Sequence, residues 1–409
     1  MVRQKNLTDV KIINRANVLQ CICEHPGITR GEIADMLGLT KMSVTNIVSE
    51  YVEKKLVREE SSAQDTGLRN AGRPFFRIYP QPRSIFVLSI SVSETELACA
   101  LVDFSCQPLY VHSMTPSTEE TNEQLLEKLD SLADQVLAEC GDLRGSIAGI
   151  GISTVGLIDY AGGRIIAADN FPYLRQLEIS GHFSGRYHLP ARIANDMDAS
   201  AMAERHYGRA VGTDNFVYMG INSCIGLGLY INGALYRGCH GYSGEIGYTT
   251  INYLGSASAF GHRGRLESYV RIDRYEKKAN EDLKSGIPGL NSFRGKKMEW
   301  KDIVEQAGKG NAYCRDIICE IGEYISIAVV NVSNLFDPEK IILGGRIALA
   351  GSLIRDYVLE HTKGHSLAAH FVPDENVPLE LSAFEDSSAI AGAGAIIFDA
   401  IFHGELSVL

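Results

Sequence analysis

The stretch TRGEIADMLGLTKMSVTNIVSEYV, residues 29–52, decides the fold of the N-terminal part of the chain. Thr29 and Glu32 have the spacing of a capping box and predict the start of one helix. Gly38 supplies a tight turn, and Thr40 is expected to cap a second helix. That second helix has an apolar stripe at helical spacing, made of Val44, Ile47, Val48, Tyr51 and Val52. Two short helices joined by a glycine-containing turn predict a helix-turn-helix.

The flanking segments extend this motif to a winged helix-turn-helix. A preceding helix is predicted over residues 9–23, and a His-Pro-Gly sequence at residues 25–27 ends it. After the motif, a polar, glycine-rich segment over residues 59–72 leads into a short strand at residues 75–78. Such a loop beside a strand is a wing. We therefore expect residues 1–82 to form a winged helix-turn-helix domain with its linker.

The outward face of the third predicted helix is polar, as expected of a helix that enters the major groove of DNA. Its candidate DNA-binding residues are Lys41, Met42, Ser43, Thr45, Asn46 and Ser49. Asn46 could pair bidentately with adenine, and Lys41 could bind a guanine or a phosphate. We expect Ser43 and Thr45 to hold phosphates. The alternative is a winged helix that binds another protein.

The wing and the charge distribution indicate the same partner. Arg69 and Arg73 lie in the wing, and Arg73 precedes Pro74, so an extended arginine could enter a narrow minor groove. An ordinary linker role for Arg73 is the alternative. Residues 1–80 carry 12 Lys and Arg against 9 Asp and Glu, whereas the rest of the chain carries 27 against 41. A basic head on an acidic body favours DNA binding by the head.

Composition restricts the class of protein. With 409 residues, 45% of them apolar and 22% charged, the chain is typical of a globular protein with two or three domains. No apolar run reaches the ~20 residues that a membrane span needs, and no apolar block follows the basic N-terminus as in a signal peptide. Nine cysteines without paired spacing indicate reduced thiols. We expect a cytoplasmic protein with no membrane partner.

The remainder of the chain has the pattern of an α/β domain. Strands are expected over residues 85–92, 96–103, 109–114, 146–153, 191–194, 216–222, 227–231 and 340–343. Helices are expected over residues 119–140, 266–279, 301–307, 313–335, 349–359 and 388–402. Asn232-Gly233 predicts a hairpin turn. Gly149, Gly151 and Gly156 are expected to let the backbone pass close to a ligand.

Four motifs in this body resemble those of the ROK family of repressors and sugar kinases. They are Ala194-Asn195-Asp196-Met197-Asp198-Ala199, Asn232-Gly233-Ala234-Leu235-Tyr236-Arg237-Gly238, Gly244-Glu245-Ile246-Gly247 and Ile341-Ile342-Leu343-Gly344-Gly345. The head resembles the operator-binding domain of the repressor branch, which includes the N-acetylglucosamine and glucose regulon repressors. The resemblance implies an α/β fold of two actin-like (ribonuclease H-like) lobes that close over a sugar.

The same resemblance implies the division of the body into lobes. Residues 83–409 would form the ligand-sensing domain. Its small lobe would span about residues 83–197 together with a C-terminal helix over about residues 388–409, and its large lobe about residues 198–387. The helices over residues 313–335 and 388–402 could form a dimer interface or belong to the core of the domain.

The resemblance also implies a ligand site. In the family the Asn-Asp pair contacts the sugar and the Asp is the base of the kinases, which carries over to Asn195 and Asp196. The implied ligand-binding residues are Asn195, Asp196, Glu245, Tyr248, Glu267, Gly156 and Asn170. Buried carboxylates at such positions would accept hydrogen bonds from sugar hydroxyls. The alternatives are a helix cap for Asn195 and Asp196, and positions behind the ligand for Glu245 and Glu267.

The phosphate loops and the zinc motif of the family are changed in this chain. The first loop, Asp-x-Gly, becomes Ser91-Val92-Ser93, and the second, Gly-Thr-Gly, becomes Asn222-Ser223-Cys224. A side chain at each lost glycine closes the approach that phosphate oxygens need. The positions of the four zinc ligands are occupied by Ser258, Phe260, Arg265 and Tyr248, none of which suits zinc. We expect no metal, no cofactor and no kinase activity, with Asp196 as a vestigial base.

The sequence thus predicts a DNA-binding transcriptional regulator, by resemblance a repressor. Its affinity for operator DNA would be controlled by a sugar or another polyol in a kinase-like cleft, with lobe closure as the switch. We expect a homodimer or tetramer whose two heads contact half-sites of a near-palindrome. Two alternatives stay open, a sugar kinase with degenerate loops and a regulator controlled by a protein partner.

Overall fold

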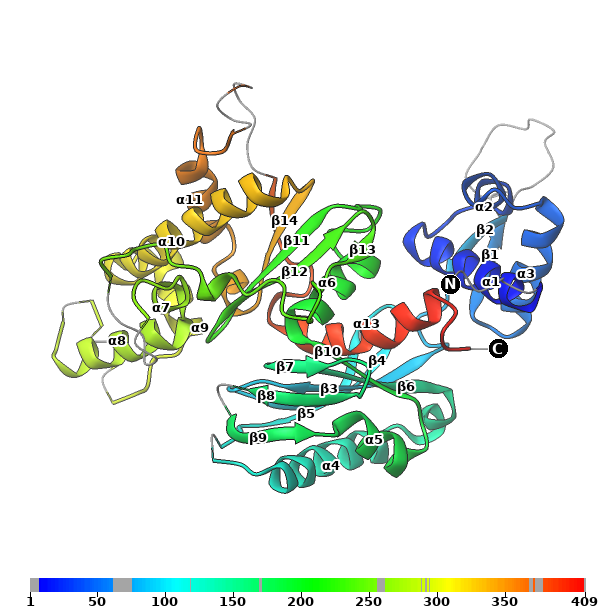
Figure 1. The fold of residues 1–409 in the computed structure, drawn as a ribbon, viewed down its shortest axis with the longest axis horizontal. Coiled ribbons are helices and arrows are strands. Elements are labelled where there is room, and N and C mark those ends of the chain that lie inside the picture. The colour runs from blue at the N-terminus through cyan, green and yellow to red at the C-terminus, as the bar shows by residue number, and fades with distance from the viewer. Residues whose placement is uncertain are drawn as a thin grey trace. The chain divides into compact units, whose positions relative to one another are not determined.

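The structure is a computed structural model (Figure 1). It describes residues 7–61, 76–117, 119–168, 171–255, 262–287, 289–290, 293, 295–367, 371 and 378–407. Contacts between Cα atoms divide the chain into two compact units. The first unit contains Met1–Ala194 and Ile390–Leu409, and the second contains Asn195–Ala389.

The N-terminal segment of the first unit folds as the predicted winged helix-turn-helix. Its elements are α1 (Leu7–Glu24), α2 (Arg30–Leu37), α3 (Lys41–Glu53), β1 (Val57–Ser61) and β2 (Phe76–Pro80). Thr29 forms both hydrogen bonds of a capping box with Glu32, and Thr40 caps α3 by accepting from the Ser43 amide. Gly38 ends α2 at φ 63°, a conformation that favours glycine. Strands β1 and β2 pair antiparallel, and the predicted wing residues between them lie outside the described ranges.

The main sheet of the first unit has the strand order β10-β6-β3-β4-β5. Its strands are β3 (Phe86–Val92), β4 (Leu97–Asp103), β5 (Pro108–Met114), β6 (Ile147–Thr154) and β10 (Ala191–Asn195). Helix α4 (Asn122–Glu139) begins at a Thr121 capping box and buries Leu125, Leu129 and Leu132 in the same core as Phe86 and Leu88 of β3. Strands β3, β4 and β5 are antiparallel, whereas β6 pairs parallel to β3.

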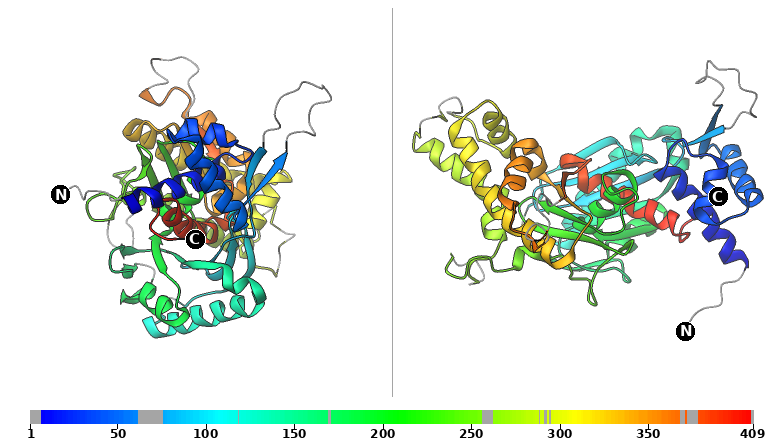
Figure 2. Two further views of the ribbon diagram at one scale, coloured as in Figure 1. Left: turned by 90° about the vertical axis from the view of Figure 1, so that its right-hand side faces the viewer. Right: turned by 90° about the horizontal axis from the view of Figure 1, so that it is seen from above.

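Helix α13 (Ser388–Phe402) returns to this sheet, and Figures 1 and 2 show it in red beside the cyan strands. A Cβ atom on Gly151 of β6 would lie 1.7 Å from the carbonyl oxygen of Ala393, and one on Gly149 would lie 3.1 Å from the Ile397 side chain. These two glycines therefore admit a helix, and the expectation that they face a ligand is wrong. Their neighbour comes from a distant part of the sequence.

A second, three-stranded sheet in the first unit was not predicted. It consists of β7 (Leu157–Asp159), β8 (Arg164–Ala168) and β9 (Phe171–Leu177) and is followed by α5 (Ile179–Tyr187). Gly156, with φ 94°, precedes β7, and a Cβ atom there would lie 2.4 Å from the carbonyl oxygen of Ala167. A glycine is thus required at position 156, both by the close packing on β8 and by the positive φ.

The sheet of the second unit has the strand order β13-β12-β11-β14-β15. The strands are β11 (Phe216–Ile221), β12 (Ile225–Ile231), β13 (Ala234–Leu235), β14 (Lys340–Gly344) and β15 (Leu379–Leu381). Strands β11, β12 and β13 are antiparallel, and β14 and β15 add in parallel. The first unit likewise combines three antiparallel strands with a parallel neighbour, β6. Asn232 and Gly233, both with positive φ, form the predicted hairpin turn between β12 and β13. The repeated topology confirms the predicted two-lobed, ribonuclease H-like architecture.

Helices cover the second sheet. They are α6 (Asp196–Tyr207), α7 (Glu267–Val270), α8 (Ile272–Lys284), α9 (Trp300–Gly308), α10 (Ala312–Phe336) and α11 (Ser352–Thr362). The single helix predicted over residues 266–279 is wrong, because Arg271 adopts an extended backbone, ψ 123°, and separates α7 from α8. The helix predicted from residue 349 starts only at Ser352, because Gly351 has φ 56°. No helix in the described part of the chain is both long and apolar enough to cross a membrane.

Candidate ligand and DNA sites

Asn195 and Asp196 lie at the junction of β10 and α6. The Asn195 side-chain oxygen accepts a hydrogen bond from the Met197 amide at 2.9 Å, so Asn195 is the N-cap of α6. Asp196 is the first residue of the helix, and burial raises the pKa of its carboxyl to about 7, with the negative charges of Glu245 and Asp198 adding to the effect. The capping interpretation thus holds for Asn195, whereas Asp196 is a carboxyl group that titrates near neutrality.

The second acidic residue of this motif, Asp198, was not among the predicted site residues. Asp198 is buried and accepts a hydrogen bond from Nε of Arg237 at 3.0 Å. Arg237 belongs to the motif that begins at the β12–β13 turn. This ion pair therefore joins two of the four sequence motifs, and Arg237 supplies the counter-charge that a buried carboxylate needs.

Glu245 and Glu267 are brought near each other by the loop that follows β13. The carbonyl oxygen of Gly244 accepts from the Leu227 amide at 2.9 Å, which attaches the loop to β12. A Cβ atom on Gly247 would lie 3.3 Å from Cβ of Glu267. The raised pKa of Asp196 depends in part on the charge of Glu245, so that carboxylate faces Asp196. Asp196 and Glu245 are thus coupled electrostatically, and Glu267 packs against the turn that follows Glu245.

Tyr248 and Arg265 occupy two positions where the resemblance places zinc ligands. The guanidinium carbon of Arg265 lies 4.3 Å from the centroid of the Tyr248 ring, which makes a cation–π contact. Arg265 is buried, whereas Tyr248 is 43% exposed. Ser258 and Phe260, the other two positions, lie outside the described residues. An aromatic ring and a cation therefore hold together two segments that a metal would otherwise link.

Two predicted ligand residues are not brought to this cluster by any described contact. Asn170 lies outside the described residues. Gly156 belongs to the first unit, and its packing against β8 accounts for the glycine. Their role in ligand binding stays a prediction.

Asn222 and Ser91 belong to the two segments that are predicted to replace phosphate loops. The Asn222 side-chain oxygen accepts from the Arg346 amide at 2.8 Å, and the Asn222 carbonyl accepts from the Ile272 amide at 3.0 Å. The Arg346 guanidinium forms an ion pair with Glu276. Ser91 is buried within β3. The side-chain oxygen and the backbone carbonyl of Asn222 are therefore both engaged in hydrogen bonds within the second unit.

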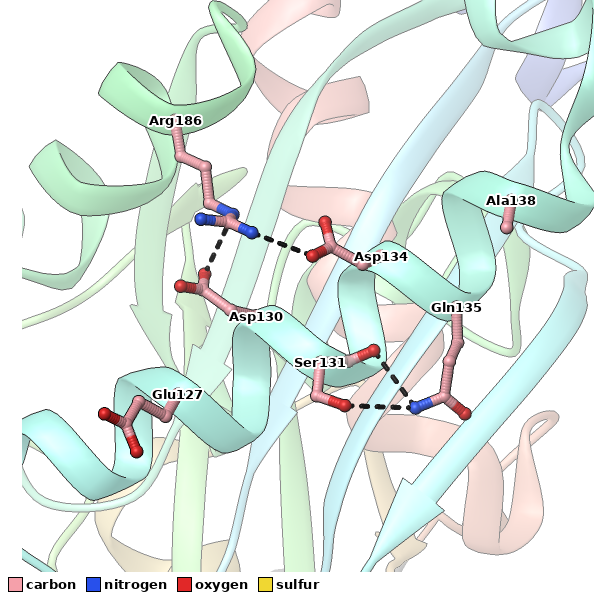
Figure 3. Close-up of a pocket in the computed structure, with 7 residues that line it drawn as sticks. All are labelled: Glu127, Asp130, Ser131, Asp134, Gln135, Ala138 and Arg186. Carbon is pink, nitrogen blue, oxygen red and sulfur yellow. Dashed lines mark hydrogen bonds and ion pairs between the residues drawn. The ribbon is translucent and has the colours of Figure 1, made fainter.

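A separate groove of about 580 Å³ lies on the first unit, on the surface of α4 (Figure 3). Figure 3 shows Arg186 pointing toward Asp130 and Asp134, and its Nη2 donates to Asp134 at 2.8 Å. Asp130 also pairs with His182 at 2.9 Å. Because these charged groups satisfy one another, the groove offers little for a polar ligand.

The predicted DNA-binding face of α3 is available in the folded head. Lys41, Met42, Asn46 and Ser49 are exposed, as an approach to base edges requires. Ser43 contributes to the N-cap of α3, and Thr45 donates to the carbonyl of Lys41 at 2.7 Å, so both hydroxyls also have structural partners. Arg69 and Arg73 lie outside the described residues.

Arg30, at the start of α2, was missed by the sequence interpretation. Its Nη2 lies 3.4 Å from Oγ of Ser49 and 3.0 Å from a carboxylate oxygen of Glu59. The contact places a cation beside the outward face of α3. Its position at a helix N-terminus, where phosphates bind, was the signal that could have identified it.

Comparisons with known proteins agree with this architecture. A family model described as ROK family matches residues 87–400, and one described as MarR family matches residues 8–66. A xylose repressor of Caldicellulosiruptor bescii is 25% identical over 401 residues, which are 96% of this chain and 97% of that protein.

Two further relatives cover nearly the whole of this chain. The transcriptional dual regulator NagC of Escherichia coli is 26% identical over 408 residues, 98% of this chain and 96% of NagC. A crystal structure of a ROK family transcriptional regulator, described as a homolog of the E. coli Mlc protein, superposes with a TM-score of 0.76 at 25% identity and covers 97% of each chain. The head and the body thus occur together, in this order, in proteins named as transcriptional regulators.

Proposed function

This chain belongs to the ROK family, and from that premise we propose that it is a sugar-responsive transcriptional repressor. Residues 1–82 are the DNA-binding domain, and residues 83–409 are the ligand-sensing domain. Operator DNA and a small sugar or polyol are its partners, and it acts in the cytoplasm, where the DNA is.

The observation that carries the proposal is the pairing of an exposed recognition helix with a polyol-type carboxylate cluster in one chain. On α3, Asn46 and Lys41 are exposed and hydrogen-bonding groups are directed outward. In the second unit, Asp196 and Glu245 provide acceptors that suit sugar hydroxyls. Relatives of the same length are named as repressors for xylose and as NagC, which supports control by a sugar but gives no single ligand.

The proposed ligand site contains Asn195, Asp196, Glu245, Tyr248 and Glu267. The resemblance adds Gly156 and Asn170, whose part in ligand binding stays a prediction. Ligand binding would change the relative population of two arrangements of the chain, only one of which fits the operator. A coupling of about 1–3 kcal/mol would change operator affinity about 5- to 150-fold. A homodimer would present two heads to two half-sites.

Loss of kinase activity is part of the proposal. Phosphoryl transfer depends on backbone amides and charged groups arranged around the nucleotide. The Arg346 amide donates to Asn222, and Ser91 is buried in a strand. Both observations support the proposal that residues 83–409 contain no ATP-binding site. The sensing function would then use Asp196 as a hydrogen-bond acceptor and not as a base.

One observation favours a second candidate, a sugar kinase. A carboxyl group with a pKa of about 7, as burial produces at Asp196, is suited to general base catalysis at neutral pH. Release of ADP in the presence of millimolar sugars tests this candidate. Turnover that disappears in Asp196→Asn would establish a kinase and refute the sensor, whereas equal background rates in both proteins support the sensor.

Genomic footprinting with and without candidate sugars tests the main proposal. We expect discrete chromosomal sites that the wild-type protein protects and that an effective sugar releases. The variant Asn46→Ala, which alters only an exposed side chain of α3, should lose these sites while its thermal unfolding is unchanged. Sites that form but respond only to a co-purifying protein would favour control by a protein partner, and the absence of preferred sites would refute a regulator.

A further inference from the structure

Arg265 is a buried cation with unused hydrogen-bonding capacity. The residue exposes only 9% of its surface. Among the residues that the structure describes, its side chain forms the cation–π contact with Tyr248 and neither a hydrogen bond nor an ion pair. None of its guanidinium nitrogens is among the described side-chain nitrogens that are fully buried without a partner, so its N–H groups reach solvent. The donors of Arg265 are therefore accessible to a partner from outside the chain.

The contact with Tyr248 orients these donors without using them. A guanidinium that stacks on an aromatic ring engages its flat face, whereas its five N–H groups point outward in the plane of the group. The contact holds the guanidinium carbon 4.3 Å from the centroid of the Tyr248 ring, and no described hydrogen bond uses the N–H groups of Arg265. A planar carboxylate matches the edge of a guanidinium because it can accept two parallel hydrogen bonds.

The position of Arg265 links it to the proposed sugar site. The Tyr248 amide donates to the carbonyl of Glu245 at 3.2 Å, so the ring that holds Arg265 belongs to the turn that carries Glu245. The neighbouring Gly247 approaches Cβ of Glu267. Arg265 itself precedes Glu267 by two residues, with its backbone in a bridge to Thr250. A guanidinium and two carboxylates are thereby attached to one pair of loops.

We propose that the ligand of this site is a sugar carboxylate, in which the carboxylate binds Arg265 and the hydroxyl groups bind Asp196, Glu245 and Glu267. This inference rests on the proposed function, since it names the ligand class of the same site. A sugar phosphate is disfavoured because a dianion beside three acidic residues would meet stronger repulsion than a monoanion. A neutral sugar carries no carboxylate that could accept two parallel hydrogen bonds from Arg265.

Isothermal titration calorimetry with the full-length protein tests this inference. The ligands are glucuronate and galacturonate, their neutral counterparts glucose and galactose, and glucose 6-phosphate. We expect at least one hexuronate to bind about 10- to 100-fold more tightly than its neutral counterpart, the range expected for hydrogen bonds to a charged group. Arg265→Gln should remove this preference and change the affinity for the neutral sugar less than about twofold.

A second variant separates recognition from folding. Arg265→Lys keeps the positive charge but loses the planar fork, so the preference for the acid should fall to an intermediate value. Near-ultraviolet circular dichroism shows whether each variant keeps its tertiary structure. If Arg265→Gln does not fold, the comparison of acid and neutral sugar in the wild-type protein still decides the question.

The inference is wrong if the wild-type protein binds hexuronates no better than hexoses, if it prefers glucose 6-phosphate, or if Arg265→Gln weakens acid and neutral sugar equally. The proposed function is judged by a different readout, the release of operator DNA. A neutral sugar that binds and releases the operator would support the repressor while refuting the sugar carboxylate. A protein with no preferred operator would refute the repressor itself.

Discussion

The side-chain oxygen of Asn222 lies 2.8 Å from the backbone nitrogen of Arg346 and accepts its hydrogen bond. A Cβ atom on the intervening residue, Gly345, would lie 2.8 Å from the same oxygen, so the loop after β14 closes tightly on Asn222. The contact joins the ends of the adjacent strands β11 and β14. The resemblance assigns the second phosphate loop to residues 222–224, and the first of these positions carries the amide side chain of Asn222.

Removing this side chain should destabilise the second unit. Asn222→Ala leaves the Arg346 amide without its acceptor and should lower the free energy of unfolding by about 1–3 kcal/mol. Urea denaturation measures the change. Asn222→Asp keeps an acceptor at the same place and should lose less. Equal losses in the two variants would show that the hydrogen bond contributes little.

Stability should depend on pH through Asp196. Burial raises the pKa of its carboxyl to about 7, so between about pH 4 and pH 7 the folded protein holds a proton that the unfolded chain has released. The stabilisation from this group is therefore complete below about pH 4 and is lost as the pH rises through 7. Asp196→Asn should flatten the dependence by on the order of 4 kcal/mol across this interval.

Urea denaturation of ligand-free protein between pH 5 and pH 8 provides the test. Asp316→Asn, at an exposed position of α10 in the same unit, is the matched control and should keep the wild-type slope. An unchanged slope in Asp196→Asn would assign the pH dependence to another group. If sugar hydroxyls donate to ionised Asp196, ligand affinity should rise with pH over the same range.

Gly151→Ala should disrupt the first unit. The new methyl group would lie 1.7 Å from the Ala393 carbonyl oxygen, so β6 and α13 must separate. We expect a loss of about 3 kcal/mol or more in unfolding free energy. Gly145→Ala is the control, because a Cβ atom there meets no neighbour within 4 Å. Comparable thermal stability of the two variants would contradict the packing described for α13.

Two substitutions on α3 should have different effects on DNA binding. Asn46→Ala should weaken binding to the operator by about 1–3 kcal/mol and leave binding to random duplex unchanged. Lys41→Ala, if its ammonium contacts a phosphate, should weaken both and reduce the salt dependence by about one ion. Fluorescence anisotropy at several salt concentrations separates the two patterns. Lys284→Ala, at the exposed end of α8, should behave like the wild type.

Short-range signals made the head predictable. Thr29, Gly38 and Thr40 each act on the backbone within three residues, and all three perform the expected capping or turning role. The main strands were predictable for a similar reason, since their apolar runs are long and lie between turns. By contrast, β7 has three residues and β13 has two. These strands are too short to show an alternation of apolar and polar residues in the sequence.

Long-range contacts limited the interpretation of the site. Gly149 and Gly151 could be recognised as places of close approach, but the approaching partner, α13, is distant in the sequence. Arg271 carries no glycine or proline signal for the break between α7 and α8. Arg265 was identified only as a lost zinc ligand, because its contact with Tyr248 exists only in the folded chain. The resemblance supplied the acidic residues, whereas their electrostatic coupling required coordinates.

The return of α13 to the first sheet also affects how the protein is made. The head is synthesised first and contains its own buried core, so it can fold while the ribosome is still translating. The sheet that follows lacks the helix packed on Gly151 until the whole second unit has been translated. A nascent chain would thus carry a folded head attached to an incomplete first sheet. Stalled translation would yield a fragment able to contact DNA but unable to respond to a metabolite.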